Sequence, residues 1–304
     1  MDTAEDHDLE AGRPPGPGAE ASDGGHGDYE LLDAGDGRRL ERFASVIVDR
    51  PAPAATLPRR ALPAWDDAAL RFDRGRGWST RPGRPIAPWP VRVDGLVMEL
   101  RPTAAGQLGL YPDHLASLPW LRGQVAALAG RTPGPPEALN LFGSTGLATL
   151  ALARAGAAVV HVDASRPTVR WARANAEASG LGSRPIRWIV DDALTFCQRE
   201  ARRGRRYEVI VLDPPSYGHG PSGRGRRLDE ELGQLLAATA SVLRPMGSLL
   251  VTSHTPGLDG PWLARLVGDA LDPGRSVAGG SSAIEARSGA TLEVGAFART
   301  EDVT

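Results

Sequence analysis

The feature that most constrains the fold is a regular alternation of short apolar runs with amphipathic segments from about residue 103 onward. The apolar runs have the length of buried strands and lie at 138–142, 157–162, 186–190, 207–212, 248–252 and 291–299. Segments typical of helices separate most of them. They lie at 147–155, at 165–180, between the run 186–190 and about residue 203, at 228–243 and at 261–271. This alternation predicts an α/β fold with a doubly wound, mostly parallel sheet covered by helices on both faces.

The chain ahead of this region divides into two parts. Residues 1–28 have almost no large apolar side chain, and residues 1–37 hold eleven acids against one arginine. We expect 1–28 to be a disordered acidic tail, because burial cannot offset its ordering entropy. Residues 29–102 contain short β-like runs among many Pro, Gly and Trp residues, which predicts a small β-rich subdomain. Residues 103–304 form the main domain. Its first segment, 113–128, has helical spacing, with a break or kink expected at Pro119.

Cysteine count, apolar run length and charge exclude several classes of protein. The single cysteine, Cys197, excludes a disulfide framework and a cysteine-based zinc cluster. No apolar run reaches the length of a membrane span and no secretory signal is visible, so we expect a soluble cytoplasmic protein without a membrane partner. Beyond residue 37, arginines outnumber acids by 34 to 26. This balance is compatible with a polyanionic partner without requiring one.

Polar residues follow the first three predicted strands, at the edge where such a sheet binds ligands. The turn 140–146 contains Gly143 and Gly146, which permit a close backbone approach to a ligand, but it lacks the third glycine of a dinucleotide fingerprint. Asp163 follows twenty residues after Gly143, a spacing at which an acid reaches a ribose. Asp192 follows the third strand and is suited to an adenine amino group. A tight turn and two helix caps are the structural alternatives, but three such groups together favour a nucleoside site.

The fourth and most apolar strand is followed by Asp213-Pro214-Pro215-Ser216-Tyr217. The prolines stiffen a backbone whose carbonyls face a target, although they could also serve only to end the strand. A planar amine or ring nitrogen could donate to Asp213 and to the carbonyl of Pro214 while Tyr217 stacks on the ring. We interpret this segment as the place of a flat nitrogenous acceptor.

Together these motifs resemble those of class I S-adenosylmethionine-dependent methyltransferases. More narrowly, the chain resembles the bacterial large-subunit rRNA methyltransferases that modify cytosine at ring carbon 5 or guanine at ring nitrogen 7, in a branch that lacks the PUA RNA-binding module. Residues 109–114, Gly-Leu-Tyr-Pro-Asp-His, are similar to the family segment that encloses the cofactor. The resemblance covers residues 29–304. It implies a Rossmann-like methyltransferase sheet, S-adenosyl-L-methionine as cofactor, and RNA, in particular rRNA, as the partner in rRNA processing.

The resemblance also implies roles for individual residues. Gly143, Ser144 and Gly146 would face the methionine end of the cofactor, Asp163 the ribose and Asp192 the adenine. The full set of expected cofactor residues is Tyr111, Asp113, Asn140, Phe142, Gly143, Ser144, Thr145, Gly146, Asp163, Ala164, Ser165, Asp192, Ala193 and Asp213. The residues expected to border the acceptor and carry the reaction are Asp213, Pro214, Pro215, Ser216 and Tyr217. No metal is expected.

One departure from the family pattern bears on the chemistry. The carbon-5 enzymes attack the pyrimidine ring with a cysteine in a Ser-Cys-Ser-like segment after the fifth strand, where this chain has Ser253-His254-Thr255. Cys197 lies in the predicted helix after the third strand, where a buried structural role is expected. Covalent cytosine chemistry is therefore disfavoured, and a nitrogen acceptor is expected. His254 is either a general base or a structural residue.

Arginines in the loop after the acceptor segment are candidates for substrate binding. Arg224, Arg226 and Arg227 follow a glycine-rich stretch and would reach a phosphate backbone near the acceptor. Three alternatives to an rRNA methyltransferase stay open. They are a small-molecule methyltransferase on the same scaffold, a cofactor-binding RNA-associated factor without catalysis, and a nicotinamide-dependent oxidoreductase, which the missing third glycine disfavours.

Overall fold

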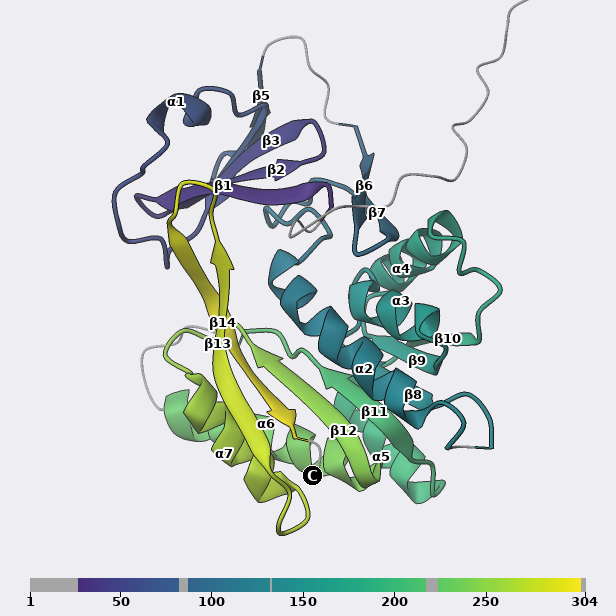
Figure 1. Cartoon of the computed structure of the whole chain (residues 1–304). Helices are drawn as coiled ribbons and strands as arrows, with labels where there is room; N and C mark the ends of the chain where they lie inside the picture. The colour runs from purple at the N-terminus through teal and green to yellow at the C-terminus, as the bar shows by residue number, and fades with distance from the viewer. Residues whose placement is uncertain (1–26, 82–86, 132, 217–223, 302–304) are drawn as a thin grey trace, which may run out of the picture.

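The computed structural model describes residues 27–81, 87–131, 133–216 and 224–301, without the side chains of 224–229. Its larger part is built on a seven-stranded sheet with the order β10-β9-β8-β11-β12-β14-β13 (Figure 1). The strands are β8 (Glu137–Leu141), β9 (Ala158–Asp163), β10 (Ile186–Val190), β11 (Tyr207–Leu212), β12 (Leu243–Ser253), β13 (Val277–Glu285) and β14 (Thr291–Thr300). The first five run parallel, and β14 is antiparallel to both of its neighbours. The predicted parallel-rich α/β sheet is confirmed.

Helices cover both faces of this sheet, because alternate residues of each strand belong to different cores. Ala138 and Leu139, for example, lie in separate clusters of buried side chains. One cluster receives apolar side chains from α2, α3 and α4, and the other from α5, α6 and α7. The helices are α2 (Leu118–Leu128), α3 (Leu147–Arg154), α4 (Arg166–Ala178), α5 (Ala193–Arg202), α6 (Arg224–Ser241) and α7 (Gly260–Ala270). Among the described helices, none is long and apolar enough to cross a membrane.

The predicted helix starts follow capping chemistry. Ser165 accepts a hydrogen bond from the Thr168 amide at the start of α4, with Pro167 in the first turn. The segment predicted at 113–128 divides into a 3-10 helix, η1 (Pro112–Ser117), and α2. Pro119 lies in the first turn of α2, where a missing N–H costs no intrahelical hydrogen bond. The predicted break is therefore present.

The N-terminal part forms a separate, predominantly β layer, as predicted. It contains a five-stranded sheet in sequence order, a short helix and a two-stranded hairpin. The elements are β1 (Tyr29–Gly35), β2 (Arg38–Phe43), β3 (Val46–Pro51), α1 (Leu62–Trp65), β4 (Leu70–Asp73), β5 (Gly77–Thr80), β6 (Trp89–Val93) and β7 (Leu96–Leu100). Asp36-Gly37 and Asp94-Gly95 have positive φ and close two of its hairpins, as Asp-Gly pairs favour. Residues 1–26 of the expected acidic tail lie outside the described part of the chain.

Strand β13 is absent from the prediction, since its Gly279-Gly280 pair is atypical of a strand. The structure gives the reason for both glycines: a Cβ on Gly279 would lie 2.1 Å from the carbonyl oxygen of Gly260 in α7, and one on Gly280 would lie 2.9 Å from the Phe297 ring. The helix and the strand therefore pack backbone to backbone.

The turn between β13 and β14 reaches the N-terminal sheet (Figure 1). The amides of Arg287 and Ser288 donate to the carbonyls of Leu31 and Leu32 at 2.8 and 3.1 Å. The Ser288 hydroxyl also donates to the Asp33 carboxylate at 2.6 Å. These contacts hold the N-terminal sheet above the carboxyl ends of the parallel strands and so position one wall of the site.

Candidate active site

A cavity of about 680 Å³ lies between the two sheets. Its walls come from β2 and the segment after β3, from the carboxyl edge of the large sheet, and from β14. The residues that line it are Arg39, Pro51, Ala52, Pro53, Ala54, Gln107, Tyr111, Asp113, Phe142, Ser144, Asp163, Asp213, Pro214, Pro215, Ser216, His254, Pro256, Leu292, Glu293 and Val294. A volume of this size is typical of a site for a small organic ligand. Phe142 and Ser144 of the predicted turn, Asp163 and the segment 213–216 thus face one space.

The first predicted turn has the strained backbone expected of a ligand-binding loop. Phe142 and Ser144 have φ values of 55° and 48°, which non-glycine residues rarely adopt. Phe142 and Ser144 line the main cavity, and the other predicted residues of the turn line a smaller adjoining cavity of about 30 Å³. Its lining residues are Tyr111, His114, Asn140, Phe142, Gly143, Ser144, Thr145, Gly146, Leu147, Ala148, Val211 and Asp213.

Gly143 is required for packing inside the protein. A Cβ at this position would lie 2.5 Å from the imidazole of His161, which is completely buried on β9. The sequence predicted a glycine for close approach of a ligand, whereas the described close approach is that of a side chain from the neighbouring strand. Gly146 does adopt a left-handed backbone, with φ 96°, at the start of α3.

Asp163 fixes the turn from the end of β9. Its Oδ2 accepts a hydrogen bond from the Ser144 amide at 3.0 Å, and its Oδ1 accepts one from the Ser165 amide at 2.8 Å. Each carboxylate oxygen keeps a second lone pair for a ligand. The carboxylate therefore orders the loops around the cavity, and the ribose contact stays a prediction.

Asp192 caps a helix, which is the structural role that the sequence left open for it. It is the N-cap of α5, and its Oδ1 accepts a hydrogen bond from the Thr195 amide at 2.8 Å. Asp192, Ala164, Ser165 and Ala193 are outside the lining of both cavities described above. Their predicted contacts with a cofactor stay predictions.

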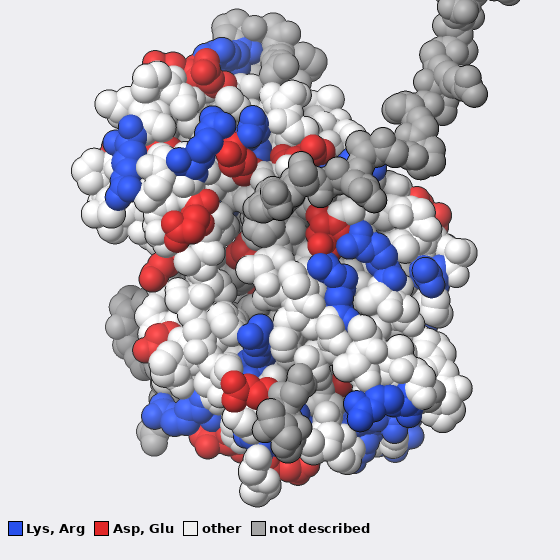
Figure 2. Space-filling model, viewed as in Figure 1, with Lys and Arg blue, Asp and Glu red and all other residues white. Residues whose placement is uncertain are grey.

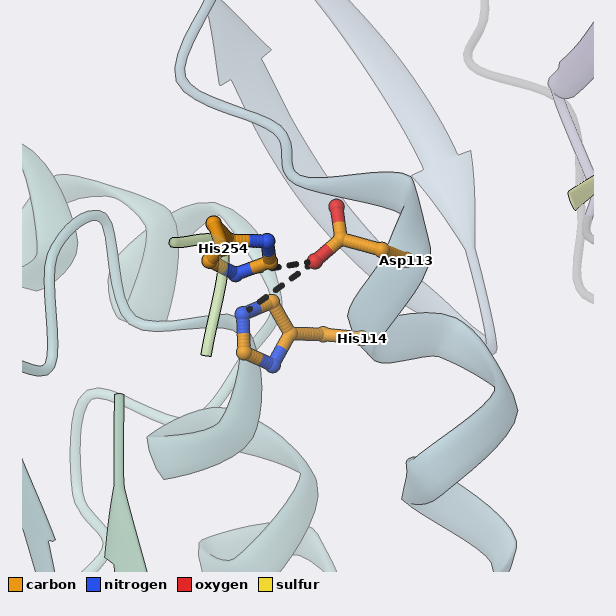
Figure 3. Close-up of side chains that lie close together, drawn as sticks. All are labelled: Asp113, His114 and His254. Atoms are coloured by element: carbon orange, nitrogen blue, oxygen red, sulfur yellow. Dashed lines mark ion pairs between the residues drawn. The ribbon is translucent and has the colours of Figure 1, made fainter. Parts of the chain in front are cut away.

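Asp213 lies just after β11, between two histidines. Its Oδ2 lies 3.0 Å from His114 Nε2, and its Oδ1 accepts a hydrogen bond from Thr252 Oγ1 at 2.5 Å and lies 3.2 Å from His254 Nε2. Asp113 adds a second carboxylate, whose Oδ2 lies 3.4 Å from His254 Nε2 and 3.6 Å from His114 Nε2 (Figure 3). Three separate segments, η1 and the ends of β11 and β12, thus bring four ionisable groups together.

The carboxylates decide the charge of both imidazoles. Burial by itself would lower the pKa of His114, but Asp213 and Asp113 outweigh it and raise that pKa to about 9. The pKa of His254 is likewise about 9, because the same two carboxylates outweigh burial. Burial would raise the pKa of Asp213, yet His114 and His254 hold it well below its ordinary range. With pKa values of about 9, both imidazoles are protonated at neutral pH, a state in which His254 cannot act as a base.

His114 belongs to the segment 109–114 that the sequence predicted to enclose the cofactor, but it is absent from the predicted site residues, which include its neighbours Tyr111 and Asp113. The only available signal is its place beside Asp113, because the distance to Asp213 spans 99 positions in the chain. Of the acceptor segment, Pro214, Pro215 and Ser216 line the cavity, and the Ser216 hydroxyl donates to the His254 carbonyl at 3.2 Å.

Four predicted residues are not described at the level their roles require. Tyr217 lies outside the described residues. Arg224, Arg226 and Arg227 belong to the first turns of α6, but their side chains are outside the description. The stacking wall and the substrate-binding arginines therefore stay predictions.

Comparison with known proteins identifies similar chains. Residues 129–224 match the family model described as Conserved hypothetical protein 95. The crystal structure of a SAM-dependent methyltransferase from Agrobacterium tumefaciens is 33% identical, covers 92% of both chains and superposes with a TM-score of 0.82.

Two curated relatives are ribosomal RNA large subunit methyltransferases. The K/L enzyme of Methylococcus capsulatus is 36% identical over 148 residues, which are 48% of this chain and 19% of that protein. The I enzyme of Shewanella amazonensis is 26% identical over 251 residues, 81% of this chain and 60% of that protein. The chain thus spans about a fifth of the first relative and three fifths of the second.

Proposed function

Because the chain belongs to the S-adenosylmethionine-dependent methyltransferases, we propose that it transfers a methyl group from this cofactor to a nucleobase nitrogen of ribosomal RNA. The observation that carries the proposal is the shared cavity, which joins the 142–144 turn and Asp163 to the acceptor segment 213–216. The position of these segments at the carboxyl edge of the sheet supports it. The rRNA methyltransferases among the relatives support the choice of substrate.

The charge of the cavity fits the cofactor. Four carboxylates, from Asp113, Asp163, Asp213 and Glu293, line it together with two cationic side chains, the guanidinium of Arg39 and the imidazolium of His254, so negative charge is in excess. S-adenosylmethionine carries a sulfonium, an ammonium and a carboxylate, and so a net positive charge. Bound there, it supplies an activated methyl group. The chain orients donor and acceptor and excludes water, since alignment accounts for much of the rate in such transfers.

A nitrogen acceptor is supported by the position of the only sulfur nucleophile. Cys197 is completely buried in α5, and burial raises the pKa of its thiol to about 12. The thiolate required for attack on a pyrimidine ring is therefore missing from the cavity. Pro214 and Asp213 both line the cavity, and the proposal is that the Pro214 carbonyl and the Asp213 carboxylate accept hydrogen bonds from a flat base, with Tyr217 as the proposed stacking partner.

The test of the site is methyl transfer by an Asp213→Ala variant. We expect turnover to fall by about 10²- to 10³-fold, because the acceptor loses a fixed electrostatic partner, while binding of the cofactor largely survives. Radiolabel incorporation into rRNA measures the first quantity, and calorimetry with S-adenosylmethionine measures the second. The matched control is Asp269→Ala, which removes an exposed carboxylate from α7. Unchanged turnover in the Asp213 variant would refute the assignment.

The substrate class is tested by salt. On the face that Figure 2 shows, the described arginines and acids are interspersed over both parts of the molecule. Even so, an RNA substrate predicts that affinity falls steeply with added salt, because bound phosphates release counterions. Activity that is insensitive to salt would favour a small-molecule acceptor. Mass spectrometry of rRNA nucleosides from a strain without the gene, compared with its parent, identifies the modified base.

A further inference from the structure

We propose that Asp113, His114, Asp213 and His254 form a binding site for one divalent transition-metal ion of the zinc type. Asp113, Asp213 and His254 line the cavity, and His114 lies beside Asp113 in η1. Figure 3 shows the side chains of Asp113, His114 and His254 directed at one another. The inference goes beyond the proposed methyl transfer, which requires no metal.

The spacing of the donor atoms is the first support. His114 Nε2 and His254 Nε2 lie 3.0 and 3.2 Å from the two oxygens of Asp213, and 3.6 and 3.4 Å from Asp113 Oδ2. In a tetrahedral zinc site with ligands at roughly 2.0–2.1 Å, neighbouring ligand atoms are about 3.3 Å apart. The donor atoms of Asp113, His114 and His254 all lie within 4.8 Å of one another. The donor atoms of Asp113, His114 and His254 are therefore close enough to share one ion, and an oxygen of Asp213 lies beside each imidazole.

The orientation of His254 is the second support. Its Nδ1 lies 2.9 Å from the Val294 carbonyl, which fixes the ring and directs Nε2 into the cluster. Within the described part of the chain, Nε2 is buried and makes no hydrogen bond, although two carboxylate oxygens lie at 3.2 and 3.4 Å. Both carboxylates therefore lie within ion-pair distance of this nitrogen, but neither accepts a hydrogen bond from it. Metal-bound histidines are held in the same way, by a carbonyl on the far ring nitrogen.

Charge and ligand type are the third support. The two carboxylates carry two negative charges, which a divalent ion balances as well as two imidazole protons do. Mixed imidazole and carboxylate ligands select ions such as Zn²⁺, Co²⁺ or Mn²⁺, whereas Mg²⁺ and Ca²⁺ prefer oxygen alone. Asp113, Asp213 and His254 line the cavity, which gives an ion a route to the cluster. Thr252, which donates to Asp213, supplies the outer contact that such sites have.

The experiment titrates the untagged full chain, freed of metal with a chelator, with ZnCl₂ in a calorimeter and with CoCl₂ in a spectrophotometer. We expect one ion per chain and the visible ligand-field bands of cobalt bound to nitrogen and oxygen, with little heat from MgCl₂. His254→Gln and Asp113→Asn are expected to weaken binding by about 100-fold or more, and Thr252→Val by about 10-fold. Thermal unfolding of each variant verifies that it is folded.

Glu293→Gln is the matched control. It removes one carboxylate charge from the same cavity, as Asp113→Asn does, but lies outside the cluster, and we expect it to bind the ion as the parent does. Absence of bound cobalt in the parent would overturn the inference, and so would parent-like affinity in folded His254→Gln, since the ion would then sit elsewhere. Because this titration requires no methyl acceptor, its outcome is independent of the proposed methyl transfer.

Discussion

Two histidine clusters near the same edge of the sheet differ in what surrounds the imidazole. On β9, His161 is fully buried and its Nδ1 lies 2.9 Å from Thr149 Oγ1, which in turn accepts a hydrogen bond from Asn140 at 2.8 Å. No charged group offsets burial there, and burial lowers the pKa of His161 to about 4. His114 is also buried, but two carboxylates raise its pKa to about 9. A carboxylate within ion-pair distance therefore reverses the effect of burial.

The largest effect expected from this contrast is a loss of folding stability at low pH, caused by protonation of His161. Its pKa is lower in the folded protein than the ordinary value of 6.5, so the unfolded chain binds more protons. Its stabilising contribution is complete above pH 6.5 and is lost as the pH falls towards 4, by about 3 kcal/mol in total. Urea unfolding at several pH values, compared with a His161→Gln variant that cannot titrate, measures this slope. Equal slopes for the two proteins would contradict the assignment.

A smaller loss is expected when the contact between Gly143 and His161 is overfilled. In Gly143→Ala the new Cβ would meet the buried imidazole at 2.5 Å, which we expect to cost about 2 kcal/mol of unfolding free energy. Gly268→Ala is the control. It lies in α7 with nothing within 4 Å of the new Cβ, so a gain of about 0.4–1 kcal/mol is expected. Chemical denaturation measures the unfolding free energy of both variants. A Gly143→Ala variant as stable as the parent would show that the His161 imidazole moves aside at no cost.

The smallest effect comes from the hydroxyl that links Asn140 to His161. Thr149→Val keeps the shape of the side chain but leaves two buried polar groups without this partner, at an expected cost of about 1.5 kcal/mol. Thr291→Val is the control, because that hydroxyl is exposed and contacts an exposed carboxylate. A change within about 0.5 kcal/mol is expected for the control. Thermal unfolding distinguishes the two outcomes, and a neutral Thr149→Val would mean that the hydrogen bonds contribute no net stability.

Sequence patterns predicted those features of the cavity that depend only on a residue's position in a strand–helix unit. The strands before Gly143, Asp163 and Asp213 follow from local apolar runs, and topology then brings those three strand ends to one edge. The same logic was less informative for Asp192, because an N-cap and an adenine contact require the same residue at the same position. The sequence did not predict strand β13, because its Gly279 is required for close packing against helix α7, which a local pattern does not reveal.

By itself, the sequence determined the alternation of strands and helices, the carboxylates that end the strands, and the absence of a cysteine after the fifth strand, because apolar periodicity and residue chemistry are local properties. The tertiary structure alone decided that His114 and His254 flank Asp213, that Gly143 accommodates His161, and that the β13–β14 turn holds the N-terminal sheet over the cavity. Such juxtapositions join segments up to 255 positions apart, and they arise only when the cores on both faces of the sheet have packed.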